Sequence, residues 1–251
     1  MVPDWYAWHT DYDQPESALS RRLAEVRRQV GAALDRAPAG PLRALSLCAG
    51  QGRDLIPVLA EHPRRVDVTA RLVELDARNA GLAAEAARAA GLTGVEVVRG
   101  DAADTDVWAD LVPAEIVLVC GLFGNVSDAD VRAVARHCGA LCATGGTVVW
   151  TRHREAPDLV PAICDWFAEE GFELLSLTAP EVRNGVGAHR HTGRPHPLPA
   201  GVGMFRFVTD HDRPATPPPT GDATAGGAPI RSTAGLPGGD DVARQRPEEL
   251  R

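Results

Sequence analysis

The chain has 251 residues, of which 44% are hydrophobic, and this length suits one α/β domain with extensions better than two independent domains. Its formal net charge of −8 argues against a general nucleic-acid binder, which needs clustered cations that release counterions. All 26 basic residues are arginine, which excludes mechanisms that need a lysine amine, from a Walker-type phosphate loop to a Schiff base.

The sequence carries no sign of export or of a metal site. No apolar run approaches the roughly twenty residues of a membrane span, and the N-terminal residues lack a signal-peptide pattern. The five cysteines lack the paired spacing of structural zinc ligands. We therefore expect a cytoplasmic protein with free thiols, no bound metal and no membrane partner.

Residues 1–40 combine an aromatic segment with an amphipathic helix. The aromatic and histidine residues of the segment are Trp5, Tyr6, Trp8, His9 and Tyr12. Apolar residues then recur at three- and four-residue steps from 15 to 36, which predicts a helix with one stripe packed on the body. Two interpretations of the aromatic residues stay open: a lid that covers a bound ligand, or an anchor that docks the terminus.

Residues 41–209 alternate between strand and helix patterns, which predicts an α/β fold with a doubly wound, mostly parallel sheet. Residues 44–47 and 116–119 are mostly apolar and do not alternate between apolar and polar side chains, which suits parallel strands covered on both faces. The predicted strands are 43–48, 67–74, 95–99, 115–120, 146–151, 172–177 and 204–208. The predicted helices are 53–62, 78–90, 128–141 and 156–170, with a short one at 105–111.

The end of the chain is predicted from its composition. The segment between 178 and 203 is rich in glycine, histidine and proline, and we expect it to cross the rim of the sheet before the last strand. Residues 210–251 contain Pro-Pro-Pro, Gly-Gly and scattered charges, with too little apolar material to offset ordering entropy. They are predicted to form a disordered tail.

A glycine-rich turn follows the first predicted strand, at Cys48-Ala49-Gly50-Gln51-Gly52-Arg53-Asp54. Its glycines permit unusual dihedrals and let a ligand approach the backbone beside the positive end of a helix. Gly-x-Gly alone also suits an ordinary tight turn. A nicotinamide dinucleotide fingerprint would need a third glycine three positions after Gly52, where this chain has Leu55.

Acidic residues end the next two predicted strands. Glu74 can accept hydrogen bonds from both hydroxyls of an adenosine ribose, and Asp101 can accept one from the amine of adenine. Each could instead be a solvated strand end or, for Asp101, a helix cap. Because the ends of parallel strands meet at one edge of a sheet, the turn and the two acids together predict a nucleoside site.

These motifs resemble those of the class I S-adenosylmethionine (SAM)-dependent methyltransferases, over residues 42–208. That family's first motif, acidic-x-Gly-x-Gly-x-Gly, is matched with Cys48 in the acidic position and Asp54 in that of the third glycine. The resemblance implies SAM as cofactor and a seven-stranded sheet of order 3-2-1-4-5-7-6 with an antiparallel last strand. It implies SAM contacts at Cys48, Ala49, Gly50, Gln51, Gly52, Asp54, Glu74, Leu75, Asp101, Ala102, Cys120 and Gly121.

Methyl transfer from a sulfonium needs alignment more than a dedicated base, although a hydroxyl acceptor must lose its proton. His153, just past the fifth predicted strand, is the first candidate for that base, and His189 and His191 are alternatives expected at the rim. Asn125 could bind an acceptor through its amide, or could be a turn residue before a helix cap at Ser127.

The class of acceptor follows from motifs that the chain lacks. It has neither the Asn/Asp-Pro-Pro-aromatic motif of amine-directed nucleic-acid methyltransferases nor the Pro-Cys motif of enzymes that attack cytosine carbon. We therefore expect a small-molecule acceptor. Two alternatives stay open: a SAM-fold binding protein or partner subunit without transferase activity, and aminopropyl transfer from decarboxylated SAM, for which few acidic residues are available.

Overall fold

The computed structural model describes residues 12–14, 16–198 and 201–208. Within them, the helices are α2 (Ala18–Arg36), α3 (Ile56–Glu61), α4 (Ala77–Ala89), α5 (Asp128–Leu141) and α6 (Val160–Glu169), with the short turns η2 (Pro63–Val66) and η3 (Thr105–Val107). The strands are β1 (Leu42–Leu47), β2 (Val68–Glu74), β3 (Val95–Arg99), β4 (Ala114–Val119), β5 (Cys142–His153), β6 (Phe172–Leu177) and β7 (Asn184–His191). None of these helices is long and apolar enough to cross a bilayer. Residues 5–9 and the predicted tail 210–251 lie outside the described residues.

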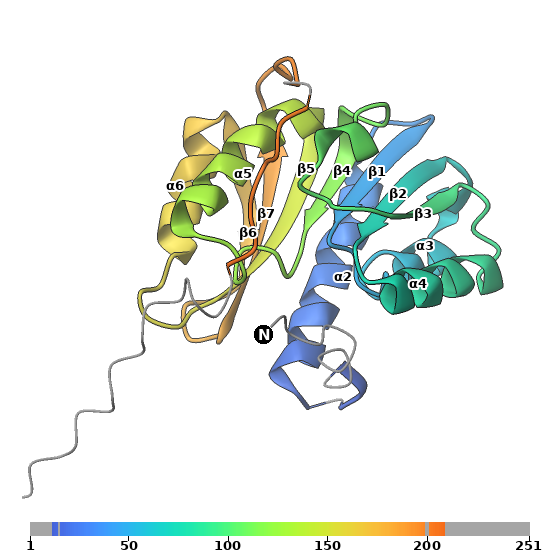
Figure 1. Cartoon of the computed structure of the whole chain (residues 1–251), viewed down its shortest axis with the longest axis horizontal. Coiled ribbons are helices and arrows are strands. Elements are labelled where there is room, and N and C mark those ends of the chain that lie inside the picture. The colour runs from blue at the N-terminus through green and yellow to red at the C-terminus, as the bar shows by residue number, and fades with distance from the viewer. Residues whose placement is uncertain (1–11, 15, 199–200, 209–251) are drawn as a thin grey trace, which may run out of the picture. The chain divides into compact units, whose positions relative to one another are not determined.

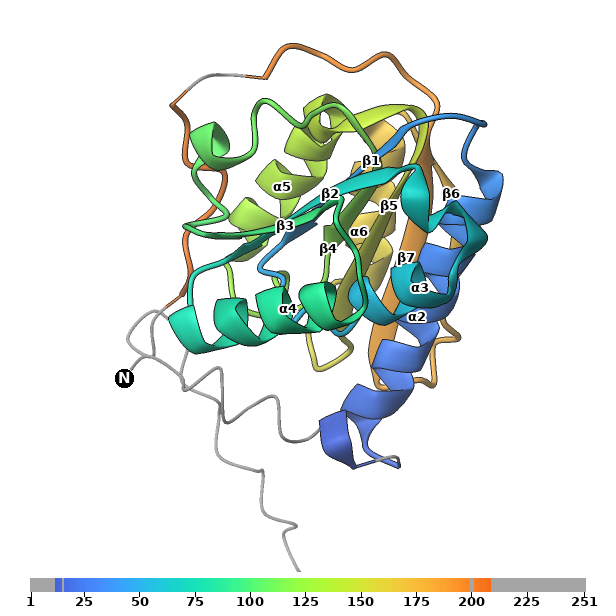
Figure 2. The same ribbon diagram turned by 90° about the vertical axis from the view of Figure 1, so that its right-hand side faces the viewer.

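In this part of the chain, seven strands form one sheet in the order β3-β2-β1-β4-β5-β7-β6. β7 runs antiparallel to both of its neighbours, and the other neighbouring pairs are parallel. Figures 1 and 2 show α2, α3 and α4 on one face of the sheet and α5 and α6 on the other. The strand order and the antiparallel last strand implied by the family resemblance are confirmed.

Side chains of the central strands alternate between two cores. In β1, Leu45 and Leu47 belong to the core shared with α5 and α6, whereas Leu42 and Ala44 belong to the core shared with α2, α3 and α4. β4 divides its side chains between the same two cores. Because both faces are covered, these strands need no polar side, which explains why apolar side chains point to both faces.

The prediction that placed the last strand at 204–208 is wrong, because the last strand, β7, lies at Asn184–His191. Two of its glycines make room for large side chains of neighbouring elements. A Cβ at Gly187 would lie 2.4 Å from Cε2 of Trp150, and one at Gly185 would lie 2.7 Å from Cγ2 of Val160. Glycine weakens an isolated strand, but here it permits close packing in the interior of the sheet.

The two histidines predicted at the rim are instead buried in β7. Nδ1 of His189 accepts a 3.1 Å hydrogen bond from Nε1 of Trp150, and burial lowers the pKa of His189 to about 4. Nδ1 of His191 lies 2.8 Å from the carbonyl oxygen of Cys142. Cys142 begins β5, at the edge opposite the carboxyl ends of the parallel strands. The expectation that these histidines reach the site is therefore wrong.

Residues 201–208 form an extended segment outside the sheet. It makes two isolated bridges, between Gly203 and Asp104 and between Phe207 and Val126. Phe205 is buried in the same core as α5. The segment thus lies beside the connection between β3 and β4, which contains only the short η3.

Helices α3 and α6 begin later than predicted, at 56 rather than 53 and at 160 rather than 156. Each has a proline in its first turn, Pro57 in α3 and Pro161 in α6. Proline lacks a backbone N–H and has a helical φ, so it is tolerated in the first turn and disrupts a helix interior. The two prolines therefore mark where the helices begin.

Candidate active site

β1 and β4 lie side by side at the centre of the sheet, and the chain leaves them towards opposite faces. After β1 it enters α3 on one face, and after β4 it enters α5 on the other (Figure 1). Such a reversal opens a crevice beyond the strand ends, where doubly wound folds bind ligands. The glycine loop 48–54 lies at this point.

Every second residue of the glycine loop adopts a left-handed backbone conformation: φ is +53° at Cys48, +56° at Gly50 and +67° at Gly52. Gly52 is also needed for space, because a Cβ there would lie 2.5 Å from Cδ1 of Ile56. A left-handed φ is easy for glycine and costs other residues roughly 1–2 kcal/mol. Cys48 therefore adopts a conformation that usually belongs to glycine.

This conformation changes the match to the family's first motif. The three left-handed residues have the same spacing as the motif's three glycines, and if they are matched to those glycines the acidic position falls at Ser46 instead of Cys48. Ser46 lies in β1 and is 1% exposed. Asp54 then follows the motif instead of replacing its third glycine.

Glu74 ends β2, and its carboxylate holds the glycine loop. It is 8% exposed, and its Oε2 accepts a 2.7 Å hydrogen bond from N of Gly50. Its Oε1 accepts one of 2.8 Å from N of Asp76. N of Ala49 also donates a 3.0 Å hydrogen bond to the carbonyl oxygen of Val73 in β2. The predicted proximity of the loop and the second-strand acid is confirmed as a direct contact.

Asp101 follows β3 and lies near the same loop. Its side chain is exposed, and Oδ1 accepts a 2.9 Å hydrogen bond from the backbone N–H two residues further on. Ala102 is buried, and Leu75, directly after β2, is 58% exposed. Burial raises the pKa of the Cys48 thiol, and the charges of Glu74 and Asp101 raise it further. These two acids and Cys48 therefore lie close together.

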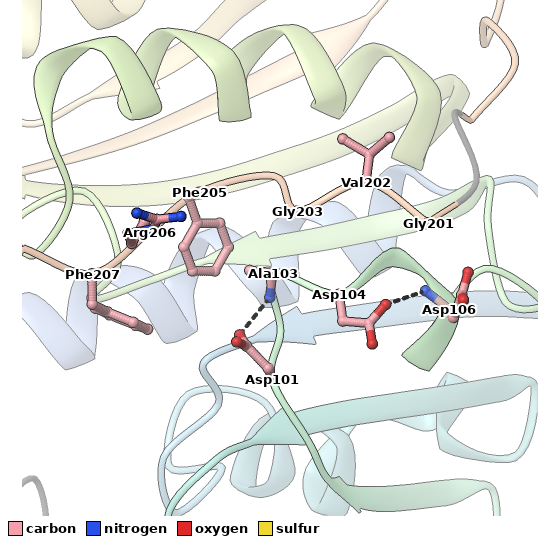
Figure 3. A pocket seen from close by; sticks show the side chains of 10 residues that line it. All are labelled: Asp101, Ala103, Asp104, Asp106, Gly201, Val202, Gly203, Phe205, Arg206 and Phe207. Atoms are coloured by element: carbon pink, nitrogen blue, oxygen red, sulfur yellow. Dashed lines mark hydrogen bonds between the residues drawn. The ribbon is translucent and has the colours of Figure 1, made fainter.

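A pocket of about 520 Å³ opens beside Asp101, between the loop 101–106 and the segment 201–207. Figure 3 shows Phe205 and Phe207 on that segment, with Asp101 and Asp104 on the facing loop. The lining also contains Arg206, and its phenylalanine and aspartate side chains suit a flat ring that carries an amine. Sequence reasoning missed the two phenylalanines because it assigned them to the last strand.

The loop after β4 is held by the end of β5. N of Gly121 donates a 2.9 Å hydrogen bond to Oγ1 of Thr151, and Nδ2 of Asn125 donates one of 2.7 Å to the carbonyl oxygen of Gly121. The ring of His153 lies against Gly124, where a Cβ would be 3.2 Å from its Cδ2, and the His153 side chain is 35% exposed. The structure therefore brings Asn125 and His153 to one loop.

The first described residues of the chain contact the glycine loop. Arg53 pairs with Asp13 at 2.6 Å, and its Nε donates a 2.9 Å hydrogen bond to Oε1 of Gln51. The guanidinium carbon of Arg53 lies 5.7 Å from the centre of the Tyr12 ring. Arg22 of α2 donates a hydrogen bond to the Tyr12 hydroxyl. The described end of the aromatic segment thus lies at the site.

The sheet order, the glycine loop after β1 and the acid that ends β2 define a class I, SAM-dependent methyltransferase fold. The family model described as "Putative methyltransferase" matches residues 19–163, which is more than half of the chain. The chain belongs to this methyltransferase family. No curated protein matches it significantly.

Solved structures share the fold at low sequence identity. An O-methyltransferase family protein from Burkholderia thailandensis is 18% identical with a TM-score of 0.54, over 69% of this chain and 56% of that one. An O-methyltransferase family 2 protein from Planctomyces limnophilus is 16% identical with a TM-score of 0.51, over 68% and 59%. Magnesium protoporphyrin IX methyltransferase from Synechocystis PCC 6803 is 12% identical with a TM-score of 0.52, over 68% and 79%. The chain thus spans less than two thirds of the first two proteins.

Proposed function

We propose that this protein transfers a methyl group from SAM to a small-molecule acceptor, with the donor between the glycine loop and the ends of β2 and β3. The contact of Glu74 with Gly50 carries this proposal, because it sets a buried carboxylate beside a backbone that a ligand can approach closely. A carboxylate has about four lone-pair sites, and Glu74 uses two for backbone N–H groups. The others suit the hydroxyls of a ribose. The pocket beside Asp101 suits an adenine.

SAM supplies a methyl group that is already activated by a positively charged sulfur. The chain's contribution is to align the acceptor and exclude water, and orientation alone supplies roughly 7–11 kcal/mol. The loop after β4 is held by hydrogen bonds to Thr151 and to the side chain of Asn125, and it forms one rigid wall of the acceptor site. His153 beside that loop takes the proton when the acceptor is a hydroxyl.

A small acceptor is supported by charge and by a similarly folded protein. The net charge of −8 disfavours nucleic acid as the acceptor. The protein from Planctomyces limnophilus was solved in complex with apigenin, a small molecule. We extend that acceptor class to this chain as part of the proposal.

Binding is tested with S-adenosylhomocysteine (SAH), the demethylated donor. We expect SAH to raise the melting temperature of the wild-type protein and Glu74→Gln to remove most of that protection. Glu85→Gln, which changes an exposed carboxylate on α4, is the matched control and should keep full protection. Equal protection of both variants would show that the donor binds elsewhere.

Transfer is tested separately with isotope-labelled SAM and a broad panel of hydroxyl, amine and thiol compounds of low molecular weight. Label in any one of them supports the proposed activity. Tight SAH binding without transfer across the panel would favour the remaining candidate, a SAM-binding partner subunit.

A further inference from the structure

Residues 201–208, which we call the strap, follow β7 and lie outside the sheet, on the same face as α5. Met204 and Phe205 are buried in the core that α5 shares with the sheet. The ring of Phe205 packs edge-on against that of Phe207, with centroids 5.6 Å apart. Burial of apolar side chains of this size stabilises an extended segment that has no place in the sheet. The strap is therefore held in position by its own side chains.

The backbone of the strap contacts two loops that follow different strands. N of Met204 donates a 3.0 Å hydrogen bond to the carbonyl oxygen of Ala103, in the loop after β3. Further along the strap, N of Val208 donates one of 2.9 Å to the carbonyl oxygen of Asn125, in the loop after β4. An isolated antiparallel bridge accompanies each of these hydrogen bonds. The strap therefore connects the two loops directly.

These two loops serve the two reactants of the proposed transfer. The loop 101–106 and the strap enclose the pocket of about 520 Å³ in which the adenine of the donor is proposed to bind (Figure 3). Asn125 and His153, which are proposed to face the acceptor, lie at the loop 121–126. The strap thus lines the donor pocket with its side chains and holds the acceptor loop through its backbone.

The loop 121–126 has different supports at its two ends. At its start, N of Gly121 donates its hydrogen bond to Thr151 of β5, which belongs to the sheet. At its far end, the carbonyl oxygen of Asn125 accepts its hydrogen bond from Val208 of the strap. A ligand in the pocket gains contacts with the strap and restricts its motion, and the hydrogen bond extends that restriction to the loop. Two sites are coupled when both ligands act on one shared element.

We propose that the strap couples the two halves of the site: the donor restrains Phe205 and Phe207, and Val208 passes this restraint to Asn125. The proposal rests on the proposed function and adds that a bound donor prepares the acceptor loop. Val208 lies outside the residues that line the pocket. It is thereby a positioning residue, which acts on Asn125 through its backbone N–H.

Hydrogen exchange of backbone amides with and without saturating SAH tests this coupling and needs no identified acceptor. In wild type we expect SAH to slow exchange in the loop 101–106 and, roughly fivefold or more, in the segment 123–126. That segment lies beyond Gly121, the last residue of the loop for which direct donor contact is expected. Val208→Pro removes the N–H that binds Asn125. In this variant SAH should still slow exchange in 101–106 and should no longer slow it in 123–126.

Val208→Ala is the matched control, because it shortens the same side chain and keeps the backbone N–H. It should show the wild-type slowing in 123–126, and both variants should bind SAH within roughly threefold of wild type. The proposal is overturned when SAH slows exchange in 101–106 of wild type without slowing it in 123–126. It is also overturned when Val208→Pro keeps the slowing, or when Val208→Ala loses it to the same extent. Wild-type protein that does not bind SAH, or whose loop 101–106 exchanges unchanged at saturation, would instead refute the proposed function or its donor site.

Discussion

The indole of Trp150 lies against the backbone of Gly187 in the neighbouring strand, so closely that a Cβ at position 187 would stand 2.4 Å from its Cε2 and Cζ2. Trp150 is fully buried, and its ring stacks on Phe167 with centroids 6.3 Å apart. Its Nε1 donates a hydrogen bond to His189. This one side chain therefore joins β5, β7 and α6.

Gly187→Ala is expected to lower the free energy of unfolding by roughly 1–3 kcal/mol, because the surrounding rings leave the indole no space to move. The control is Gly81→Ala in α4, where an added Cβ meets nothing within 4 Å. That change should raise stability by roughly 0.5–1 kcal/mol, since alanine favours the helix. Chemical denaturation of both variants measures the difference. An unchanged stability of Gly187→Ala would contradict the packing of β7 against β5.

The stability of the ligand-free protein should depend on pH through Asp54. Its pKa rises from 3.8 to about 6 in the folded protein, mainly through burial. The folded state therefore keeps a proton that the unfolded chain loses, and stability falls as pH rises from about 4 to about 6. A shift of about two units corresponds to roughly 3 kcal/mol, as an upper limit.

Asp54→Asn removes this dependence. At about pH 8 the variant should be more stable than wild type by up to roughly 3 kcal/mol, and the two should converge below about pH 4. Urea unfolding of both proteins as a function of pH gives the difference in their free energies of unfolding. The contributions of the other titrating groups are the same in both proteins and cancel in this difference. A variant that is less stable than wild type at about pH 8 would indicate a structural role for the carboxylate.

His153→Gln should lower kcat for a hydroxyl acceptor roughly 100-fold or more, because the variant side chain cannot take up the proton. The affinity for SAH should stay within twofold, since His153 lies at the loop after β4 and not at the glycine loop. His196→Gln, at an exposed position, is the control. A full kcat for His153→Gln with a hydroxyl acceptor would remove this residue from the mechanism.

Deleting residues 1–14 separates a lid from an anchor. Tyr12 and Asp13 contact the glycine loop through Arg53, so we expect the deletion to weaken SAH binding roughly tenfold. The melting temperature without ligand should change little, because Ser17 still caps α2 through N of Ser20. Unchanged SAH affinity with a large loss of melting temperature would favour the anchor.

Local signals were sufficient for the boundaries of several elements and for the contact between the glycine loop and Glu74. α5, β3 and β6 have the predicted boundaries, because turns and caps such as Ser127 at the start of α5 are encoded in adjacent residues. Gly50 and Glu74 could be paired from sequence because the ends of neighbouring parallel strands meet at one edge.

The tertiary structure alone decided the position of β7 and the surroundings of Asp54. Gly187 weakens a strand when it is considered locally, and it becomes favourable only where Trp150 fills the space that a side chain would occupy. Tyr12, Asp54 and Cys120 come from three segments whose spacing carries no periodic signal. Asp54 and Cys120 follow β1 and β4, which become neighbours only in the sheet, and the electrostatic influence of Asp54 on Tyr12 likewise arises only in the folded protein.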